Sequence, residues 1–200
     1  MKTKLSLLLC CLLFAGCTLL NRTAQDKATL FSQHLAFWQN LRIDGVVEVN
    51  YQQFQFRKTA VLRVNPGTIK LTIVDTGLFG LNPEPFLEAI IDSTGLALTT
   101  NGTHRELSAD SLNQLLPDLH SFLHPEDMNK FQQEIFTKGF FATPTTRYYF
   151  DDQLRLTRIQ RKFGIQIVFD WGSELQSIAI INGKKTVATL HIDTIKKRSR

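Results

Sequence analysis

The stretch that decides the fold is residues 165–195, IQIVFDWGSELQSIAIINGKKTVATLHIDTI. From Ile165 to Trp171 every second side chain is apolar, which is the period of a β-strand with one buried face. Gly172-Ser173 and Asn182-Gly183 then separate runs rich in β-branched residues, and dipeptides of this kind favour tight turns. Parallel strands need long crossover connections, so strands joined this closely must run antiparallel. The stretch therefore predicts three consecutive strands of a meander.

The same period of two recurs on both sides of the middle of the chain. It is found in residues 43–51, 54–64, 68–75, 86–92, 96–100, 103–107, 146–150 and 154–163. Asn65-Pro66-Gly67-Thr68 is a strong turn signal between two of these runs, and Asn101-Gly102 has the residues preferred in a two-residue hairpin. We expect one antiparallel sheet of about 10–11 strands.

Two regions have helical rather than strand spacing. Leu30, Phe31, Leu35, Trp38 and Leu41 fall on one stripe, which predicts an amphipathic helix of about four turns beginning near Asp26. Residues 108–116 and 126–136 are further helix candidates in the middle of the chain, punctuated by prolines. The predicted fold class is α+β: a single strongly curved sheet, an incomplete barrel, capped by an N-terminal helix and a central helical lid. The helices either fill the concavity or cover a cavity, and composition does not decide between these.

The N-terminus has the pattern of an export signal. Lys2 and Lys4 precede the apolar run from Leu5 to Phe14, which as a helix is about 15 Å long, half of a hydrocarbon core. The following Ala15-Gly16-Cys17 resembles the lipobox of bacterial lipoproteins. That resemblance implies cleavage before Cys17 and acylation of its thiol and amine, which would hold the protein on a membrane. The alternative is an ordinary secretory signal followed by a chance cysteine.

These patterns give a simple domain organisation. We expect a signal peptide at 1–16, a lipidated tether at 17–25, one domain at 26–195 and a basic tail at 196–200. Removal of the signal leaves Cys17 as the only cysteine, which excludes an internal disulfide and a thiolate metal cluster. The formal net charge is +5. We interpret the basic tail as a solvated terminus and expect no nucleic-acid partner.

Catalytic and metal sites receive little support from the sequence. His120 and His124 are one helical turn apart and could hold Zn²⁺, but flanking prolines leave room only for a short helix, and we interpret them as surface histidines. Ser108, His104 and Asp110 have the residue types of a catalytic triad, although capping of a helix also explains the serine and the aspartate. We expect no catalytic residue, no metal and no cofactor other than the lipid on Cys17.

Basic residues within the predicted strands are a further candidate surface. Five arginines could form a positive stripe on one face of the sheet: Arg57, Arg63, Arg155, Arg158 and Arg161. We favour instead a solvated outer face on which charges discourage pairing of sheet edges.

Two stretches resemble the LolA/LolB group of lipoprotein carriers. They run from Ile69-Lys70-Leu71-Thr72-Ile73 to Leu78-Phe79-Gly80, and from Leu154-Arg155-Leu156-Thr157-Arg158-Ile159 to Phe169-Asp170-Trp171. In that group an incomplete barrel with a helical lid binds the acyl chains of a lipoprotein, and the anchored member receives the cargo at the outer membrane. Thr18, in place of Asp, implies in the Gram-negative sorting rule that the anchored protein faces the periplasm from the outer membrane.

Candidate binding residues fall into two sets. Leu78, Phe79 and Leu81 lie in a predicted loop with two glycines, an asparagine and a proline, where an apolar tip would touch membrane or cargo, or else fold back under the lid. The cavity candidates are apolar residues of the predicted helix and strands: Trp38, Ile69, Leu71, Ile73, Ile167, Phe169 and Trp171.

The resulting hypothesis is an outer-membrane lipoprotein that binds acyl chains of lipoproteins or lipids for transfer or insertion. Its expected partners are the outer membrane, the acyl chains and a periplasmic carrier protein, and we expect a monomer. The alternative is a non-catalytic docking or assembly lipoprotein of an envelope complex, with the same fold and a filled core.

Overall fold

The chain is known from a computed structural model, which describes residues 23–75, 84–100, 102–111, 128–161 and 164–197. The predicted lipidation site Cys17, the loop residues Leu78, Phe79 and Leu81, and the histidine pair His120 and His124 lie outside the described residues.

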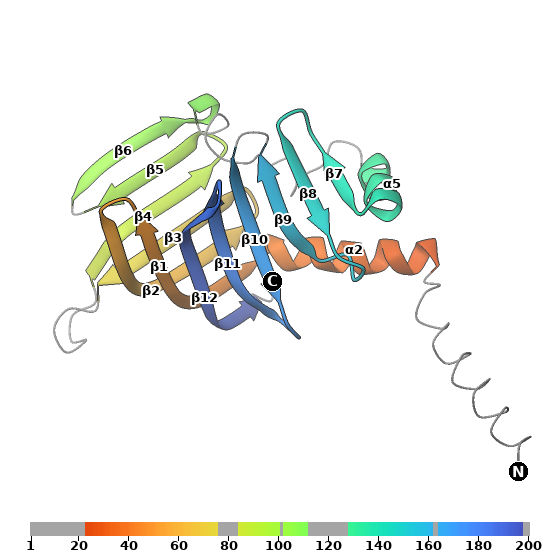
Figure 1. Ribbon diagram of the computed structural model, residues 1–200, viewed down its shortest axis with the longest axis horizontal. Helices are drawn as coiled ribbons and strands as arrows, with labels where there is room; N and C mark the ends of the chain where they lie inside the picture. Colours follow the sequence, from red (N-terminus) through yellow and green to blue (C-terminus); the bar gives the residue numbers. More distant parts are fainter. Residues whose placement is uncertain (1–22, 76–83, 101, 112–127, 162–163, 198–200) are drawn as a thin grey trace, which may run out of the picture.

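All described strands belong to one antiparallel sheet of twelve strands (Figure 1). They are β1 (Leu41–Tyr51), β2 (Phe54–Asn65), β3 (Thr68–Asp75), β4 (Glu84–Asp92), β5 (Gly95–Thr100), β6 (Thr103–Ser108), β7 (Phe140–Ala142), β8 (Thr146–Phe150), β9 (Leu156–Arg161), β10 (Ile165–Trp171), β11 (Leu175–Asn182) and β12 (Lys185–Lys197). Their spatial order is β6-β5-β4-β3-β2-β1-β12-β11-β10-β9-β8-β7. The predicted fold class is confirmed. The strand that the sequence pattern missed is β7, which at three residues is too short to show an alternation.

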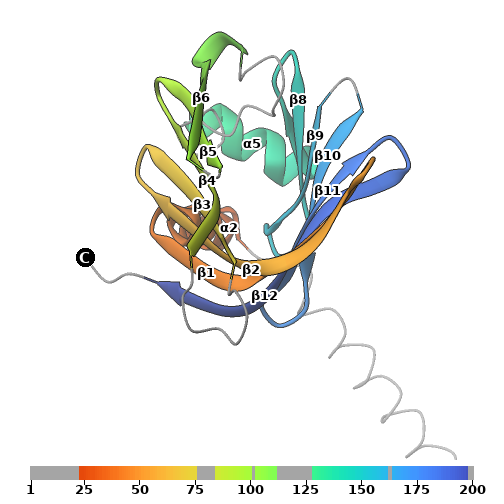
Figure 2. The ribbon, with the colours of Figure 1, turned by 90° about the vertical axis from the view of Figure 1, so that its left-hand side faces the viewer.

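The first and last strands pair in the middle of the sheet. The β1–β12 ladder runs from Leu41 opposite Lys197 to Val49 opposite Ala188 and joins two meanders into one surface. The outermost strands β6 and β7 do not pair with each other, so the sheet curves without closing (Figure 2). One consequence concerns the predicted basic tail: Lys196 and Lys197 belong to β12 rather than to a free terminus.

The N-terminal helix α2 (Ala24–Gln39) begins two residues before the expected position. Thr23 is its N-cap: the hydroxyl of Thr23 accepts from the Asp26 amide at 3.1 Å, and the Asp26 carboxylate accepts from the Thr23 amide at 3.1 Å. This reciprocal capping box satisfies two backbone N–H groups that would otherwise lack a partner. Asp26 is therefore the third residue of the helix, and the predicted tether ends before Thr23 instead of at residue 25.

Two helices fill one part of the curved sheet. Helix α5 (Met128–Lys138) lies inside the curve (Figure 2), and its Phe131 ring is 5.6 Å from that of Phe31 in α2. Phe31 also meets Phe150 of β8 edge-on at 5.8 Å. Such aromatic pairs add about 0.5–1.5 kcal/mol beyond the area they bury. Buried residues of the neighbouring strands complete this part of the core, among them Tyr148 of β8 and Ile159 of β9.

Candidate functional site: an apolar cavity

The register of the strands brings apolar side chains together on the inner face of the sheet. Leu62 of β2 is opposite Leu71 of β3, which is opposite Ala89 of β4, which is opposite Leu98 of β5. Across the β1–β12 junction a second row joins Val47 to Leu190, Ile178 and Phe169. Because side chains alternate between the faces of a strand, each row is repeated two residues further on.

These rows line a cavity of about 600 Å³. Its volume lies within the range typical of ligand-binding pockets. The lining residues are all apolar or aromatic: Trp38, Val47, Val49, Tyr51, Phe54, Phe56, Leu62, Val64, Ile69, Leu71, Ile73, Leu87, Ala89, Ile91, Leu96, Leu98, Leu156, Ile159, Ile167, Phe169, Ile178, Ile180, Ala188 and Leu190. Only Tyr51 and Trp38 bring a polar side-chain atom, the hydroxyl and the indole N–H, so this wall suits an apolar molecule and offers few hydrogen bonds to a polar one.

One end of the cavity has large apolar side chains in contact with water. Phe54 is 67% exposed and Tyr51, its partner in the β1–β2 hairpin, is 44% exposed. Ile180 of β11, also in the lining, is 36% exposed. We call these three residues the lip. Exposed apolar groups that continue a buried apolar surface are typical of a binding site.

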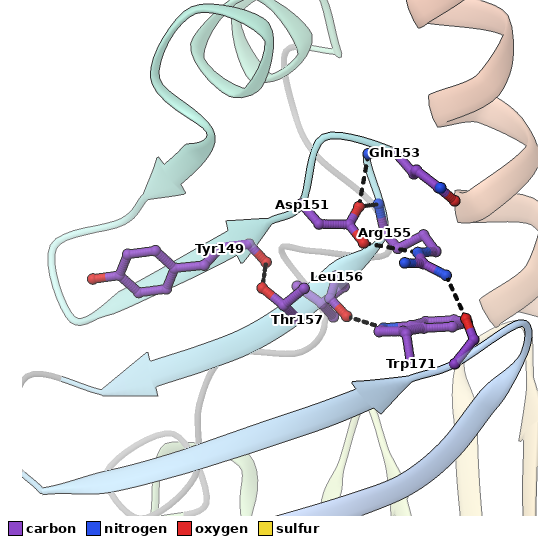
Figure 3. Close-up of polar contacts among 8 residues, drawn as sticks. Tyr149, Asp151, Gln153, Arg155, Leu156, Thr157 and Trp171 are labelled. Carbon is purple, nitrogen blue, oxygen red and sulfur yellow. Dashed lines mark hydrogen bonds and ion pairs between the residues drawn. The ribbon is translucent and has the colours of Figure 1, made fainter. Parts of the chain in front are cut away.

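Six of the seven cavity candidates lie in the cavity wall, and Trp171 does not. Trp171 keeps the alternation and lies on the same face of β10 as Phe169, because Trp38 of α2 contacts both rings, at 6.3 Å and 5.3 Å. Its ring lies 6.0 Å from Phe37 of α2, and its indole N–H donates to the Leu156 carbonyl at 2.7 Å (Figure 3). Trp171 therefore belongs to the contact between helix and sheet.

A turn between β8 and β9 fixes this contact (Figure 3). The Asp151 carboxylate accepts from the backbone amides of Gln153 and Arg155 at 2.9 Å each and from Arg155 Nε at 2.8 Å. The Arg155 guanidinium in turn donates to the Gly172 carbonyl at 3.1 Å and lies 5.3 Å from the centre of the Trp171 ring. These bonds hold β9 and the end of β10 at a fixed separation beneath α2.

Several lining residues were not among the candidates, above all the lip and Leu62, Ala89 and Leu98. The sequence contained the information needed to find the last three. The turn at Asn65-Pro66-Gly67 sets the strand register, and in that register Leu62 lies opposite the predicted candidate Leu71. The lip could not be found this way. Its exposure depends on the β1–β2 hairpin, which continues past the end of β3.

The five arginines considered as a stripe do not form one. Arg57 and Arg63 lie on β2, whereas Arg158 and Arg161 lie on β9, and four strands separate β2 from β9 in the sheet. Arg158 stacks over the Tyr149 ring at 4.0 Å, and Arg155 is held by the turn described above. The interpretation of these arginines as one positive surface is therefore wrong.

The triad considered at Ser108, His104 and Asp110 is not assembled. The two ring nitrogens of His104 contact the Thr99 hydroxyl at 3.1 Å and the Glu106 carboxylate at 2.9 Å. Ser108 donates to the hydroxyl of Ser111 at 3.2 Å. Within the described part of the chain, no group of three or more His, Cys, Asp or Glu residues could hold a metal ion.

Comparison with known proteins gives distant structural similarities only. No family model matches the sequence, and neither does any curated protein. A crystal structure of a LolA superfamily protein from Nitrosomonas europaea is 9% identical, with a TM-score of 0.45, over 90% of this chain and 96% of that one. A candidate outer membrane lipoprotein-sorting domain from Vibrio parahaemolyticus is 9% identical, with a TM-score of 0.48, over 88% of this chain and 94% of that one. At this level of similarity, the function of the chain has to be inferred from its own residues.

Across the described ranges, no helix has both the length and the apolarity needed to span a bilayer.

Proposed function

We propose that this chain binds acyl chains of lipids or lipoproteins non-covalently in the inner cavity and passes them to or from a membrane. The observation that carries the proposal is the cavity itself, whose wall is apolar throughout and continues into the exposed lip. Each methylene moved from water into such a wall contributes about 0.8 kcal/mol. No bond is made or broken, so the proposed function is not catalytic.

The form of the sheet supports exchange rather than permanent storage. Since β6 and β7 do not pair, the wall can separate at that side without breaking a ladder. The lip provides an apolar path on which a chain can leave the cavity without crossing water. Release into a bilayer then costs little, because both environments are apolar and the carrier needs only a modest preference for either.

We further propose that the protein is anchored through a lipid on Cys17 to the outer membrane and faces the periplasm, where a soluble carrier supplies its cargo. The support is the sequence of residues 1–18, with its positive start, short apolar run and small residues before the cysteine. Mass spectrometry of the processed N-terminal peptide tests this directly. An acylated Cys17 is expected, and an unmodified N-terminus at another residue would contradict the anchor.

The test of the binding function is native mass spectrometry of the chain as cells process it, released from mild detergent, followed by lipid extraction. Near-stoichiometric acylated molecules retained with the protein are the expected result. A mass without bound lipid, unchanged after incubation with phospholipid and with acylated peptide, would overturn the proposal. It would favour a docking protein that uses the same fold.

A further inference from the structure

The inner face of β1–β3 has two charged side chains, and they form a pair. Inner positions of these strands otherwise hold apolar or aromatic residues and Gly45. The exceptions are Lys58 of β2 and Asp75 at the end of β3, which the β2–β3 register places on neighbouring strands. The ammonium of Lys58 forms an ion pair with the Asp75 carboxylate.

Lys58 lies beside the cavity wall. Phe54 and Phe56 precede it on the inner face of β2, and Leu62 and Val64 follow it, and all four line the cavity. The ammonium is 4.7 Å from the centre of the Phe86 ring, and that ring is 5.4 Å from the ring of Phe56. A cation is thus held against the aromatic surface that bounds the apolar space.

The two partners differ in their access to water. The side chain of Lys58 is 20% exposed, whereas that of Asp75 is 51% exposed. A cation in largely apolar surroundings needs a counter-ion, because its desolvation is costly. The more exposed carboxylate can instead be solvated by water, and an ion pair this close to solvent contributes little to stability. Asp75 is therefore the partner that can be exchanged.

We propose that the ligand of this cavity is an anionic amphiphile and that Lys58 binds its acidic headgroup, a carboxylate or a phosphate. This rests on the proposed function, since the acyl chain would occupy the cavity while the headgroup replaces Asp75 at the ammonium. The ammonium keeps a counter-ion in both states, so binding does not leave a buried charge unpaired. A neutral amphiphile would find the Lys58–Asp75 pair intact and gain nothing from it, which makes this position selective for charge.

The test compares hexadecanoate with hexadecan-1-ol, which have the same chain length and differ in charge. Dissociation constants are measured on the full chain as cells process it, stripped of lipid and held at one concentration of a non-ionic detergent. Tryptophan fluorescence, to which Trp38 of the cavity wall contributes together with Trp171, reports binding. The variants are Lys58→Met, Lys58→Arg and, as a matched control, Lys70→Met. Lys70 lies on the opposite face of β3, where it pairs with Glu88 at 2.7 Å.

We expect the unaltered chain to bind hexadecanoate about tenfold more tightly than the alcohol, as one charge-assisted contact implies. Lys58→Met should remove this preference and leave binding of the alcohol unchanged, which also shows that the variant is folded. Lys58→Arg should retain the preference, and Lys70→Met should behave as the unaltered chain does.

Three other outcomes count against the inference. Equal binding of both probes by the unaltered chain would overturn it, and so would a preference that survives Lys58→Met. Displacement of hexadecanoate by inorganic phosphate alone would show a free-anion site rather than a headgroup site, and would overturn it too. In all three outcomes the proposed function stands. Failure of the unaltered chain and of every variant to bind either probe would overturn the proposed function as well.

Discussion

Trp38 of α2 meets Phe169 of β10 edge-on, with ring centres 5.3 Å apart, and both residues also line the cavity. Trp38 is 8% exposed and so is Phe169. The contact lies where the helix-filled part of the curved sheet ends and the empty part begins. It joins the packing of the core to the shape of the binding site.

Replacement of Trp38 by Ala should therefore affect both stability and binding. We expect a loss of about 3–5 kcal/mol in the free energy of unfolding, the usual cost of removing a large buried aromatic side chain. Urea unfolding followed by circular dichroism measures it. Leu107→Ala is the control, because Leu107 is 40% exposed and lies outside the lining, and its effect should stay within about 0.5 kcal/mol. Equal losses in the two variants would contradict the position of Trp38 in the core.

The lip should affect the rate of transfer more than stability. Phe54→Ser removes its most exposed apolar group, so the free energy of unfolding should change by less than about 0.5 kcal/mol. Transfer of a fluorescent acyl chain from the protein to vesicles should become severalfold slower, because the chain must then cross a more polar exit. Stopped-flow fluorescence measures the rate. Leu107→Ser, at an exposed position on β6 outside the lining, should leave it unchanged. Equal slowing in both variants would indicate a general surface effect.

Gly45 allows the two halves of the sheet to join. It lies at a bulge in the β1–β12 ladder, and a Cβ at this position would be 2.1 Å from the His191 carbonyl oxygen. Gly45→Ala should lower the free energy of unfolding by about 1–3 kcal/mol or more. The new methyl group would clash with the paired backbone of β12, which cannot move freely. Thermal unfolding measures the loss, and the amide exchange rates of β1 and β12 should rise. Unchanged exchange in these strands would contradict the account of the junction.

The outer face predicts one dependence on pH. The Arg42 guanidinium, at 2.7 Å, lowers the pKa of the Asp44 carboxyl below its ordinary value. The stabilisation by this ionised group is present above the pKa of the unfolded chain and is lost as the pH falls through the lower pKa of the folded state. Unfolding free energies are measured from about pH 5 down to about pH 2, the range in which carboxyl groups titrate. They should fall less steeply with pH in Asp44→Asn than in the unaltered chain. Equal slopes would contradict the assigned role of Asp44.

Prediction from the sequence succeeded where one local rule decided the outcome. The alternation from Ile165 to Phe169 placed Ile167 and Phe169 on the same face, and the structure places both in the cavity wall. Trp171 follows the same alternation but does not line the cavity, because α2 covers that end of β10 and its Phe37 ring lies 6.0 Å from Trp171. The start of helix α2 was also misplaced by the sequence pattern. Reciprocal hydrogen bonds between Thr23 and Asp26 set it, and it lies two residues before the expected position.

The cavity itself could not be predicted, because its existence depends on how far two helices extend over a curved sheet. The same apolar residues would have served a filled core equally well. What decided the outcome is that the aromatic groups of α2 and α5 pack on one side of the sheet, where Phe31 meets Phe131 and Phe150, and Trp38 meets Phe169. The inner face of β2–β5 therefore remains available to line a space.

The central claim is that this space holds an acyl chain, and filling it is the most direct test. Ala89 lies in the cavity wall on β4, and Ala89→Phe would occupy the space with a ring, whereas Ala97→Phe makes the same change on the other face of β5. Binding of hexadecan-1-ol, measured by native mass spectrometry of both folded variants, gives the answer. The account predicts that Ala89→Phe weakens binding by about tenfold or more and that Ala97→Phe leaves it unchanged. Equal binding by the two variants would contradict the claim that the cavity is the acyl-chain site.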